Sequence, residues 1–249
     1  MNKYRADLHV HTVLSPCGSL EMSPANIVET AARKNIDILG IADHNSTKHG
    51  ALIKKMAAKE GIFVLTGAEV ATKEEIHCLA FFENNETLVS FQEYLDAHIS
   101  PVINKPNAFG HQVVVDEEEM IIEEIENLLI SGLDQSIDQV EEMVHSLGGM
   151  FIPAHIDRGS YSLFSQLGFV PPGLKAEALE ISKQATPDSI LAQFPDLATY
   201  TFVQSSDAHH PEQLGTGVSN FEMKTRSFEE IRMALKGEGG RKVSLEHLH

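Results

Sequence analysis

Two short segments far apart in the chain combine histidine with carboxylate side chains where an apolar stretch ends. Residues 7–11 (DLHVH) close one such stretch near the start, and residues 205–209 (SSDAH) close another near the end. Alternate residues of a strand share one face, so His9 and His11 could bind one ion together, with Asp207 and His209 joining them from the far end of the chain. Imidazole and carboxylate groups gathered at strand ends indicate a metal-dependent enzyme.

The spacing of two histidines alone is weak support for a metal site. The chain holds 13 histidines in 249 residues, so roughly one His-x-His pair is expected by chance. His247 and His249 repeat the spacing at a tail where no site is expected. The surroundings of His9 and His11 favour a site, because residues 4–8 are typical of a strand entering a loop and similar clusters follow other predicted strands.

Length and composition predict one soluble domain over residues 1–249. The length matches a one-domain α/β barrel, and the hydrophobic content of 42% and charged content of 22% are ordinary for a globular protein. No apolar run approaches the roughly 20 residues that span a bilayer, and the N-terminus does not resemble a signal peptide. The two cysteines give no disulfide framework and favour a cytoplasmic location.

The formal net charge of −17 bears on the partners of the chain. Such a charge repels nucleic-acid backbones, and no cluster of Lys and Arg suggests a groove that follows phosphates. The charge therefore disfavours a long nucleic acid as partner and permits a small anionic substrate.

Short apolar strands alternate with amphipathic helices along the chain. A helix is predicted to begin with Ser23 as its cap and Pro24 at its first position, and another is predicted around residues 48–60. The predicted strands cover residues 37–42, 62–67, 76–81, 150–153, 178–181 and 201–204. This alternation predicts a mostly parallel sheet covered by helices. Histidines or carboxylates stand at or just beyond several strands, where α/β barrels build their active sites.

Residues 84–148 interrupt the alternation and are predicted to form an insertion beside the barrel. A short strand or hairpin arm is expected over residues 109–115. The run Asp116-Glu117-Glu118-Glu119 is expected to begin an acidic helix, and a second helix is expected over residues 134–145.

An ordered set of six motifs resembles the PHP (polymerase and histidinol phosphatase) family. The motifs are D-x-H-x-H-T at 7–12, A-D-H-N at 42–45, G-x-E at 67–69, His77, P-A-H at 153–155 and S-D-x-H at 206–209. The resemblance runs from residue 4 to about residue 236. It implies a distorted (β/α)7 barrel with two or three divalent ions at the strand ends, and it implies phosphoester hydrolysis.

The resemblance also implies a set of metal ligands. The first ion would be held by His9, His11, Glu69 and Asp207, and Glu69 would bridge to a second ion completed by His77 and His155. A third ion would take His44 and His209 with a residue that is commonly histidine in the family. Here that residue is Cys17. A thiolate ligand favours zinc or iron over manganese or magnesium, and the alternative is a small buried thiol.

Further roles follow from the chemistry of such a site. Bound cations neutralise phosphoryl oxygens and lower the pKa of a bound water toward about 7, so a metal-activated hydroxide is the expected nucleophile. The groups expected to take part directly are Glu69, Asp207 and His209. Three residues are expected to orient imidazoles through their second ring nitrogen, namely Asp7, Asp43 and Asn45. Arg158 and Lys183 could bind the substrate phosphate, although Arg158 could instead pair with Asp157.

Three functions remain open at the level of the sequence. The leading hypothesis is a phosphoesterase for a small phosphorylated metabolite, such as histidinol phosphate or a nucleotide. Metal barrels also hydrolyse amide-type bonds, and a metal-binding regulatory domain without catalysis is the third alternative. The complete ligand sets for two ions count against the third.

Overall fold

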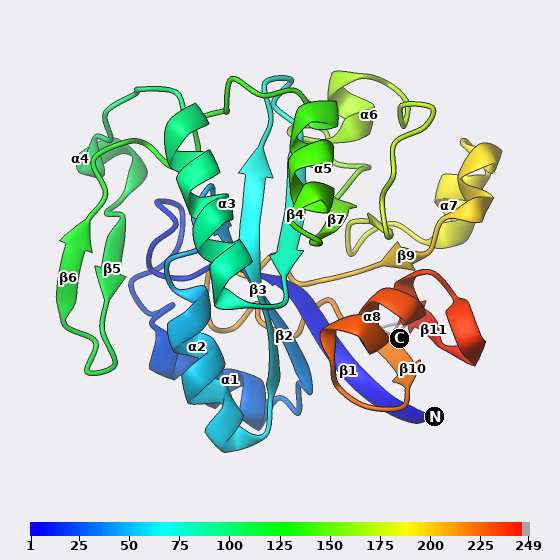
Figure 1. Ribbon diagram of the computed structural model, residues 1–249, viewed down its shortest axis with the longest axis horizontal. Helices are drawn as coiled ribbons and strands as arrows, with labels where there is room; N and C mark the ends of the chain where they lie inside the picture. The colour runs from blue at the N-terminus through cyan, green and yellow to red at the C-terminus, as the bar shows by residue number, and fades with distance from the viewer. Residues whose placement is uncertain (246–249) are drawn as a thin grey trace.

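The computed structural model describes residues 1–245 and is built on a curled sheet of seven strands in the order β11-β10-β1-β2-β3-β4-β7 (Figure 1). His247 and His249 lie outside the described residues. The strands are β1 (Asn2–Val10), β2 (Ile38–His44), β3 (Phe63–Ala71), β4 (His77–Phe82), β7 (Met150–Pro153), β10 (Ser219–Met223) and β11 (Lys242–Leu245).

The sheet is mixed, so the prediction of a mostly parallel sheet is wrong. Within it, only the pairs β1–β2 and β2–β3 are parallel, and the remaining pairs are antiparallel. The turn between β3 and β4 shows the cause: Thr72 donates its N–H to the carbonyl of Ile76 at 2.9 Å, and so short a connection cannot carry a crossover helix. The fold is therefore a mixed α/β half-barrel built on a curled sheet of seven strands.

A second pair of strands, β8 (Leu179–Glu180) and β9 (Phe202–Val203), runs between the edges of the curled sheet. The Glu177 N–H bonds to the Phe151 carbonyl at 3.0 Å beside β7. On the other side, Val10 forms a parallel bridge with Ala208, just after β9. These contacts bring the loops after β7, β8 and β9 to the same end of the sheet as the carboxyl ends of β1, β2 and β3.

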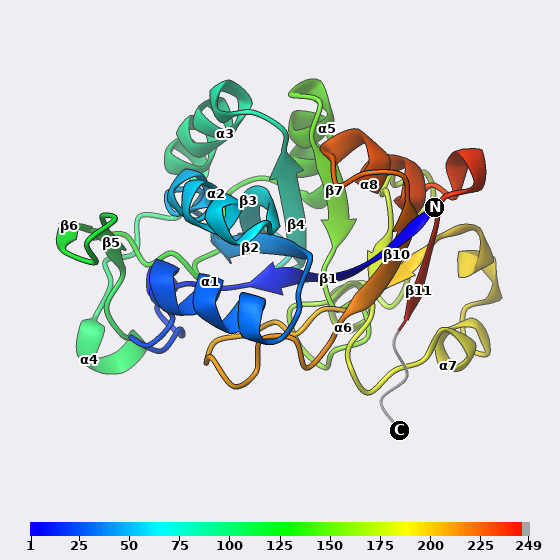
Figure 2. The same cartoon turned by 90° about the horizontal axis from the view of Figure 1, so that it is seen from below.

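Helices cover the outside of this sheet. α1 (Pro24–Arg33) and α2 (Gly50–Ala57) pack on β2 and β3, and α3 (Asn85–His98) and α5 (Ile137–Ser146) pack on β4 (Figures 1 and 2). The predicted cap is confirmed, because the Ser23 side chain accepts the Asn26 N–H. α6 (Leu163–Gln166) and α7 (Pro187–Leu191) are short. No helix within residues 1–245 is long and apolar enough to cross a membrane.

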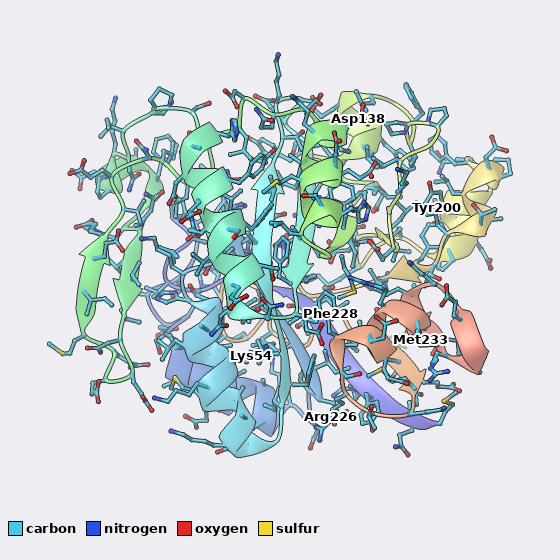
Figure 3. All side chains as sticks on the ribbon, viewed as in Figure 1. Lys54, Asp138, Tyr200, Arg226, Phe228 and Met233 are labelled. Carbon is cyan, nitrogen blue, oxygen red and sulfur yellow. The ribbon has the colours of Figure 1, made fainter. Side chains whose placement is uncertain are left out.

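The interior of the half-barrel is apolar up to the end that carries the histidines. Leu8, Leu65 and Leu79 form one buried cluster with Phe228 of α8 (Phe228–Leu235). Figure 3 shows the side chains that fill the layers, with Phe228 at the start of α8 and Asp138 on the first turn of α5. α8 thus fills part of the interior with apolar side chains.

The insertion contains a hairpin where an acidic helix was expected. β5 (Val113–Val115) pairs with β6 (Ile121–Glu124) in antiparallel register. The Asp116 carboxylate accepts the N–H groups of Glu118 and Met120, at 3.0 and 2.9 Å. This local capping of a turn, between two runs of β-branched residues, outcompetes the helix. The predicted helix over residues 134–145 is confirmed as α5, while α4 (Pro106–Phe109) is a single turn.

Candidate metal centre

The predicted metal-ligating residues all stand at one end of the strands. His9 lies in β1 and His11 just after it, His44 ends β2, and Glu69 lies near the end of β3. His77 begins β4, but β4 is antiparallel and its first residue pairs with Ala71 at the end of β3. A cavity of about 230 Å³ opens at this end. Its walls are formed by Cys17, His44, Glu69, His77, Ile130, His155, Arg158, Tyr161, Asp207 and His209.

Glu69 is the centre of the cluster and is buried with an exposed fraction of 1%. One oxygen, Oε1, faces three imidazoles and the other, Oε2, faces two. Oε1 lies 3.2 Å from His9 Nε2, 2.9 Å from His77 Nδ1 and 3.1 Å from His155 Nε2. Oε2 lies 3.3 Å from His11 Nε2 and 3.0 Å from His44 Nδ1. A carboxylate with its two oxygens turned to different imidazoles has the arrangement that a bridging ligand needs.

Asp207 faces the same imidazoles from the loop after β9. Its Oδ1 lies 3.1 Å from His11 Nε2 and 3.3 Å from His9 Nε2. His209 is close by, with its Nδ1 3.6 Å from Asp207 Oδ1. The backbone φ of Asp207 is +49° and that of His155 is +31°, and such strained residues concentrate at functional sites.

Three groups of side chains offer donor atoms that all lie within 4.8 Å of one another. They are His9/His11/Glu69, His44/Glu69/His77 and His11/His44/His209. Each group contains residues that the sequence assigns to metal binding. Cys17 is exposed and lies in the cavity wall, but its sulfur is not part of these three groups among the described residues.

The donor set fits divalent cations. The Nε2 atoms of His9 and His11 lie 3.1 Å apart and face the same carboxylates. The buried Nδ1 atom of His44 lies 3.0 Å from Glu69 Oε2 but makes no hydrogen bond of good geometry within the described residues. Buried polar atoms without partners need an explanation. Coordination of a zinc, iron or manganese ion would supply one, because these ions bind nitrogen and carboxylate ligands.

The outer ring nitrogens show how the imidazoles are oriented. His9 Nδ1 lies 3.0 Å from Glu180 Oε2, so it donates and leaves the Nε2 lone pair facing the cluster. The Ser15 hydroxyl donates to Asp43 Oδ1 at 2.7 Å and can therefore accept from His11 Nδ1 at 2.9 Å.

Burial and charge set the protonation of the cluster. Burial disfavours the charged form of His11, but hydrogen bonds to Asp207 and Glu69 outweigh it and raise its pKa to about 9. Burial raises the pKa of Glu69, but the surrounding imidazoles, led by His77, hold it well below its usual range. Burial lowers the pKa of His44 to about 4, and burial with the nearby His11 lowers that of His209 to about 3. Unprotonated imidazoles and ionised carboxylates are the forms that bind metals.

The structure gives other roles to the three residues that were expected to orient imidazoles, Asp7, Asp43 and Asn45. Asp7 accepts the N–H groups of Ser206 and Gly215, at 2.9 and 2.7 Å, and so fixes the loop that carries Asp207. Burial raises the pKa of Asp7 to about 6. Asp43 reaches the His11 imidazole through the Ser15 hydroxyl, and its Oδ2 lies 4.0 Å from Nδ1 of His49, which is not a predicted ligand. The correction has a simple physical reason: buried backbone groups of the loops also need partners, and these side chains supply them.

Asn45 holds the insertion against the sheet. Its side-chain amide donates to the carbonyls of Leu129 and Ser131, at 2.7 and 2.8 Å. Its carbonyl oxygen accepts the Ala71 N–H at 3.1 Å. These bonds go to backbone groups rather than to an imidazole, so the expected role of Asn45 is also corrected.

Of the two residues expected to bind phosphate, the structure places one in the cavity. Arg158 lines it, with Nη1 2.6 Å from Asp207 Oδ2 and 42% of its side chain exposed. Asp157 instead accepts the N–H of Ser182 at 2.7 Å. Lys183 is exposed and donates to Thr216 Oγ1 at 3.0 Å, away from the residues that line the cavity.

Three residues of the site were not predicted, namely Glu180, Tyr161 and Ile130. Glu180 could have been found, because it is a carboxylate within the buried apolar run 178–181, and a buried charge needs a partner. Tyr161 lines the cavity beside His77. No pattern in the sequence identifies it.

The chain belongs to the PHP family. The sequence profile of the PHP domain matches residues 7–157, which is more than half of the chain, and that of the PHP-associated region matches residues 192–238. Among curated proteins, the chain is 24% identical over 279 residues to the uncharacterized protein YqxK of Bacillus subtilis, covering 98% of this chain and 64% of YqxK.

Solved structures share the fold. The lesion-specific endonuclease EndoQ of Pyrococcus furiosus aligns with a TM-score of 0.76, 24% identity, and coverage of 97% of this chain and 58% of EndoQ. A two-domain protein of Bacteroides vulgatus, containing a predicted PHP-like metal-dependent phosphoesterase, aligns with a TM-score of 0.62 and 17% identity. This alignment covers 98% of the chain and 65% of that protein. The chain thus spans less than two thirds of the length of these relatives.

One of these comparisons overturns an expectation. Endonuclease Q has also been solved with a 27-mer DNA duplex that carries an abasic lesion at the active site, and that structure aligns with a TM-score of 0.75 and 23% identity, covering 97% of this chain and 58% of the endonuclease. The prediction that the net charge disfavours a long nucleic acid as partner is therefore wrong as a general rule for this fold. Net charge is a property of the whole surface, and it does not describe the field at one cavity.

Proposed function

We propose that the chain is a metal-dependent phosphoesterase. The observation that carries the proposal is the convergence of imidazoles on both oxygens of the buried Glu69 carboxylate, at distances of 2.9–3.3 Å. When bound there, zinc, iron or manganese would neutralise phosphoryl oxygens and lower the pKa of a coordinated water. Glu69 and Asp207 would hold these ions together with the imidazoles.

The residues of the chain divide the remaining work. Arg158 is positioned to donate N–H groups to a phosphoryl oxygen, since its guanidinium reaches Asp207 and is half-exposed to the cavity. The lowered pKa of His209, about 3, keeps its imidazole unprotonated near neutral pH. His209 therefore suits a metal ligand better than a proton donor.

A phosphodiester of DNA is the first candidate substrate. It is favoured by the alignment of nearly the whole chain with Endonuclease Q. A small phosphorylated metabolite is the second candidate. The small volume of the cavity, about 230 Å³, favours it.

The test is a substrate panel with the purified protein, loaded in turn with zinc, manganese or ferrous iron. The panel contains DNA duplexes with and without an abasic site, nucleoside monophosphates, histidinol phosphate and an amide substrate. We expect hydrolysis of at least one phosphoester that is lost with chelator and with Glu69→Gln. Absence of metal-dependent phosphoester hydrolysis across the panel would contradict the proposal, and hydrolysis of the amide alone would replace it.

A further inference from the structure

Three residues of the cavity wall carry neither an imidazole nor a carboxylate. They are Arg158 and Tyr161 from the loop after β7 and Ile130 from the insertion. A cation, an aromatic ring and an apolar side chain next to a metal cluster form a different kind of surface from the cluster itself. The part of a substrate beyond the phosphate can contact these three side chains.

The loop that carries Arg158 and Tyr161 is fixed by hydrogen bonds at three points. The Arg158 N–H donates to the His155 carbonyl at 3.0 Å, and the Ser162 hydroxyl donates to the Arg158 carbonyl at 2.6 Å. The His77 N–H donates to the Tyr161 carbonyl at 3.0 Å. The backbone of Arg158 and Tyr161 is therefore fixed relative to His155 and His77.

The backbone of Tyr161 is strained, with a φ of +55°. Bulky residues rarely adopt this left-handed conformation, which persists only where surrounding structure enforces it. Tyr161 is nevertheless 48% exposed, so its ring does not serve to fill the core. The surrounding loop, including the bond from the His77 N–H, holds Tyr161 in this conformation at the cavity wall.

The position of the ring defines what it can bind. It stacks on His77 with ring centroids 4.9 Å apart and planes at 20°. His77 thus fixes the ring from one direction, and the exposed part of Tyr161 remains available in the cavity wall. An exposed aromatic ring stacks on nucleobases of any sequence, because every base has a π-face.

We propose that Tyr161, with Ile130, forms a subsite for a nucleobase next to the scissile phosphoester, while Arg158 binds the phosphate. This inference rests on the proposed function, because it names the substrate class of the same site. The base would stack on the phenol ring and contact the Ile130 side chain. Recognition of this kind favours nucleotides over phosphoesters of aliphatic alcohols without reading the identity of the base.

The test compares two probes that share a sugar and a phosphate and differ in the base, thymidine 5′-phosphate and 2-deoxyribose 5-phosphate. Binding to the zinc-loaded protein is measured by calorimetry, in titrations completed before turnover is detectable. We expect the parent to bind the nucleotide about tenfold more tightly than the sugar phosphate. Tyr161→Leu should reduce this preference to within about twofold, and Tyr161→Phe should retain it because stacking needs the ring only.

Phe169→Leu is the matched control, since Phe169 is an aromatic residue with 50% exposure that does not line the cavity. It should leave the preference unchanged. Equal binding of both probes to the parent, no binding of either, or a preference retained in Tyr161→Leu would overturn the subsite. Hydrolysis of the phosphoester panel reports on the proposed function separately. A protein that hydrolyses phosphoesters without a base preference refutes only the role of Tyr161.

Discussion

Replacing Glu180 by alanine should weaken metal binding, although Glu180 is not one of the proposed metal ligands. It contacts Nδ1 of His9, the ring nitrogen that faces away from the cluster. Its Oε2 accepts two hydrogen bonds, from His9 Nδ1 and from the His155 N–H, both at 3.0 Å. Glu180 is buried, with 3% exposed, so water cannot take its place without rearrangement. The variant frees the ring of His9 and removes the contact that holds the strained backbone of His155.

The size of the effect follows from these two bonds. Loss of an outer partner of a metal-binding histidine typically costs about 10–100-fold in metal affinity. Two buried donors left without partners cost about 1–3 kcal/mol each, so the free energy of unfolding of the metal-free variant should fall by about 2–6 kcal/mol. Metal affinity is measured by competition with a chromophoric zinc chelator, and stability by urea unfolding.

Glu177→Ala is the matched control for Glu180→Ala. Glu177 also accepts a backbone N–H, from Phe151 at 2.8 Å, and also contacts a histidine, with its Oε2 3.4 Å from His145 Nε2. Its side chain is only 7% exposed. This control should lose stability without losing metal affinity. Zinc affinity of Glu180→Ala within twofold of the parent, or an equal loss in both variants, would refute the orienting role.

Three further predictions concern the cluster and its surroundings. Glu69→Ala should remove bound metal and hydrolytic activity together, while circular dichroism shows that the fold is retained. The loss of metal affinity should exceed the roughly 100-fold expected for a residue that only hydrogen-bonds to a metal ligand. Full metal content in this variant would show that Glu69 does not bridge two ions. Cys17→Ser should lower the metal count measured by elemental analysis by one ion per chain if the thiolate is a ligand, and an unchanged count in a parent with three ions would exclude that role. Hydrogen bonding to Glu177 raises the pKa of His145 above its ordinary value, so this residue stabilises the fold fully below about pH 6.5 and loses that contribution as pH rises through the raised pKa. His145→Gln should therefore destabilise the protein more at pH 6 than at pH 9 in urea unfolding, and an equal effect at both pH values would contradict the linkage.

Most metal-binding candidates could be located from the sequence because they stand next to short apolar runs. His44 and His155 follow such runs directly, and the structure brings them to one cavity. His77 shows where this reasoning fails. In the parallel sheet that the alternation predicted, the first residue of a strand lies at the end opposite the active site. Only the family resemblance assigned His77 to the cluster, and the antiparallel register of β4 explains how it arrives there.

Sequence patterns did not predict the β5–β6 hairpin or the contact by which Glu180 orients His9, for a different reason. The turn after β5 depends on the Asp116 side chain capping two backbone N–H groups, which competes with a helix start that the same acidic residues would favour. Glu180 and His9 are 171 positions apart. No local periodicity records a contact of that separation.

The failure of the charge argument has the same origin. A net charge of −17 sums over residues that the fold distributes on all its faces. At the cavity, however, buried carboxylates are surrounded by imidazoles, and Arg158 is the cationic side chain that its walls add. Divalent ions bound there would reverse the local field and attract an anionic phosphate. The net charge of the chain therefore affects how the part of a long substrate outside the cavity is held. Whether the phosphoester of that substrate can be bound depends on the cavity.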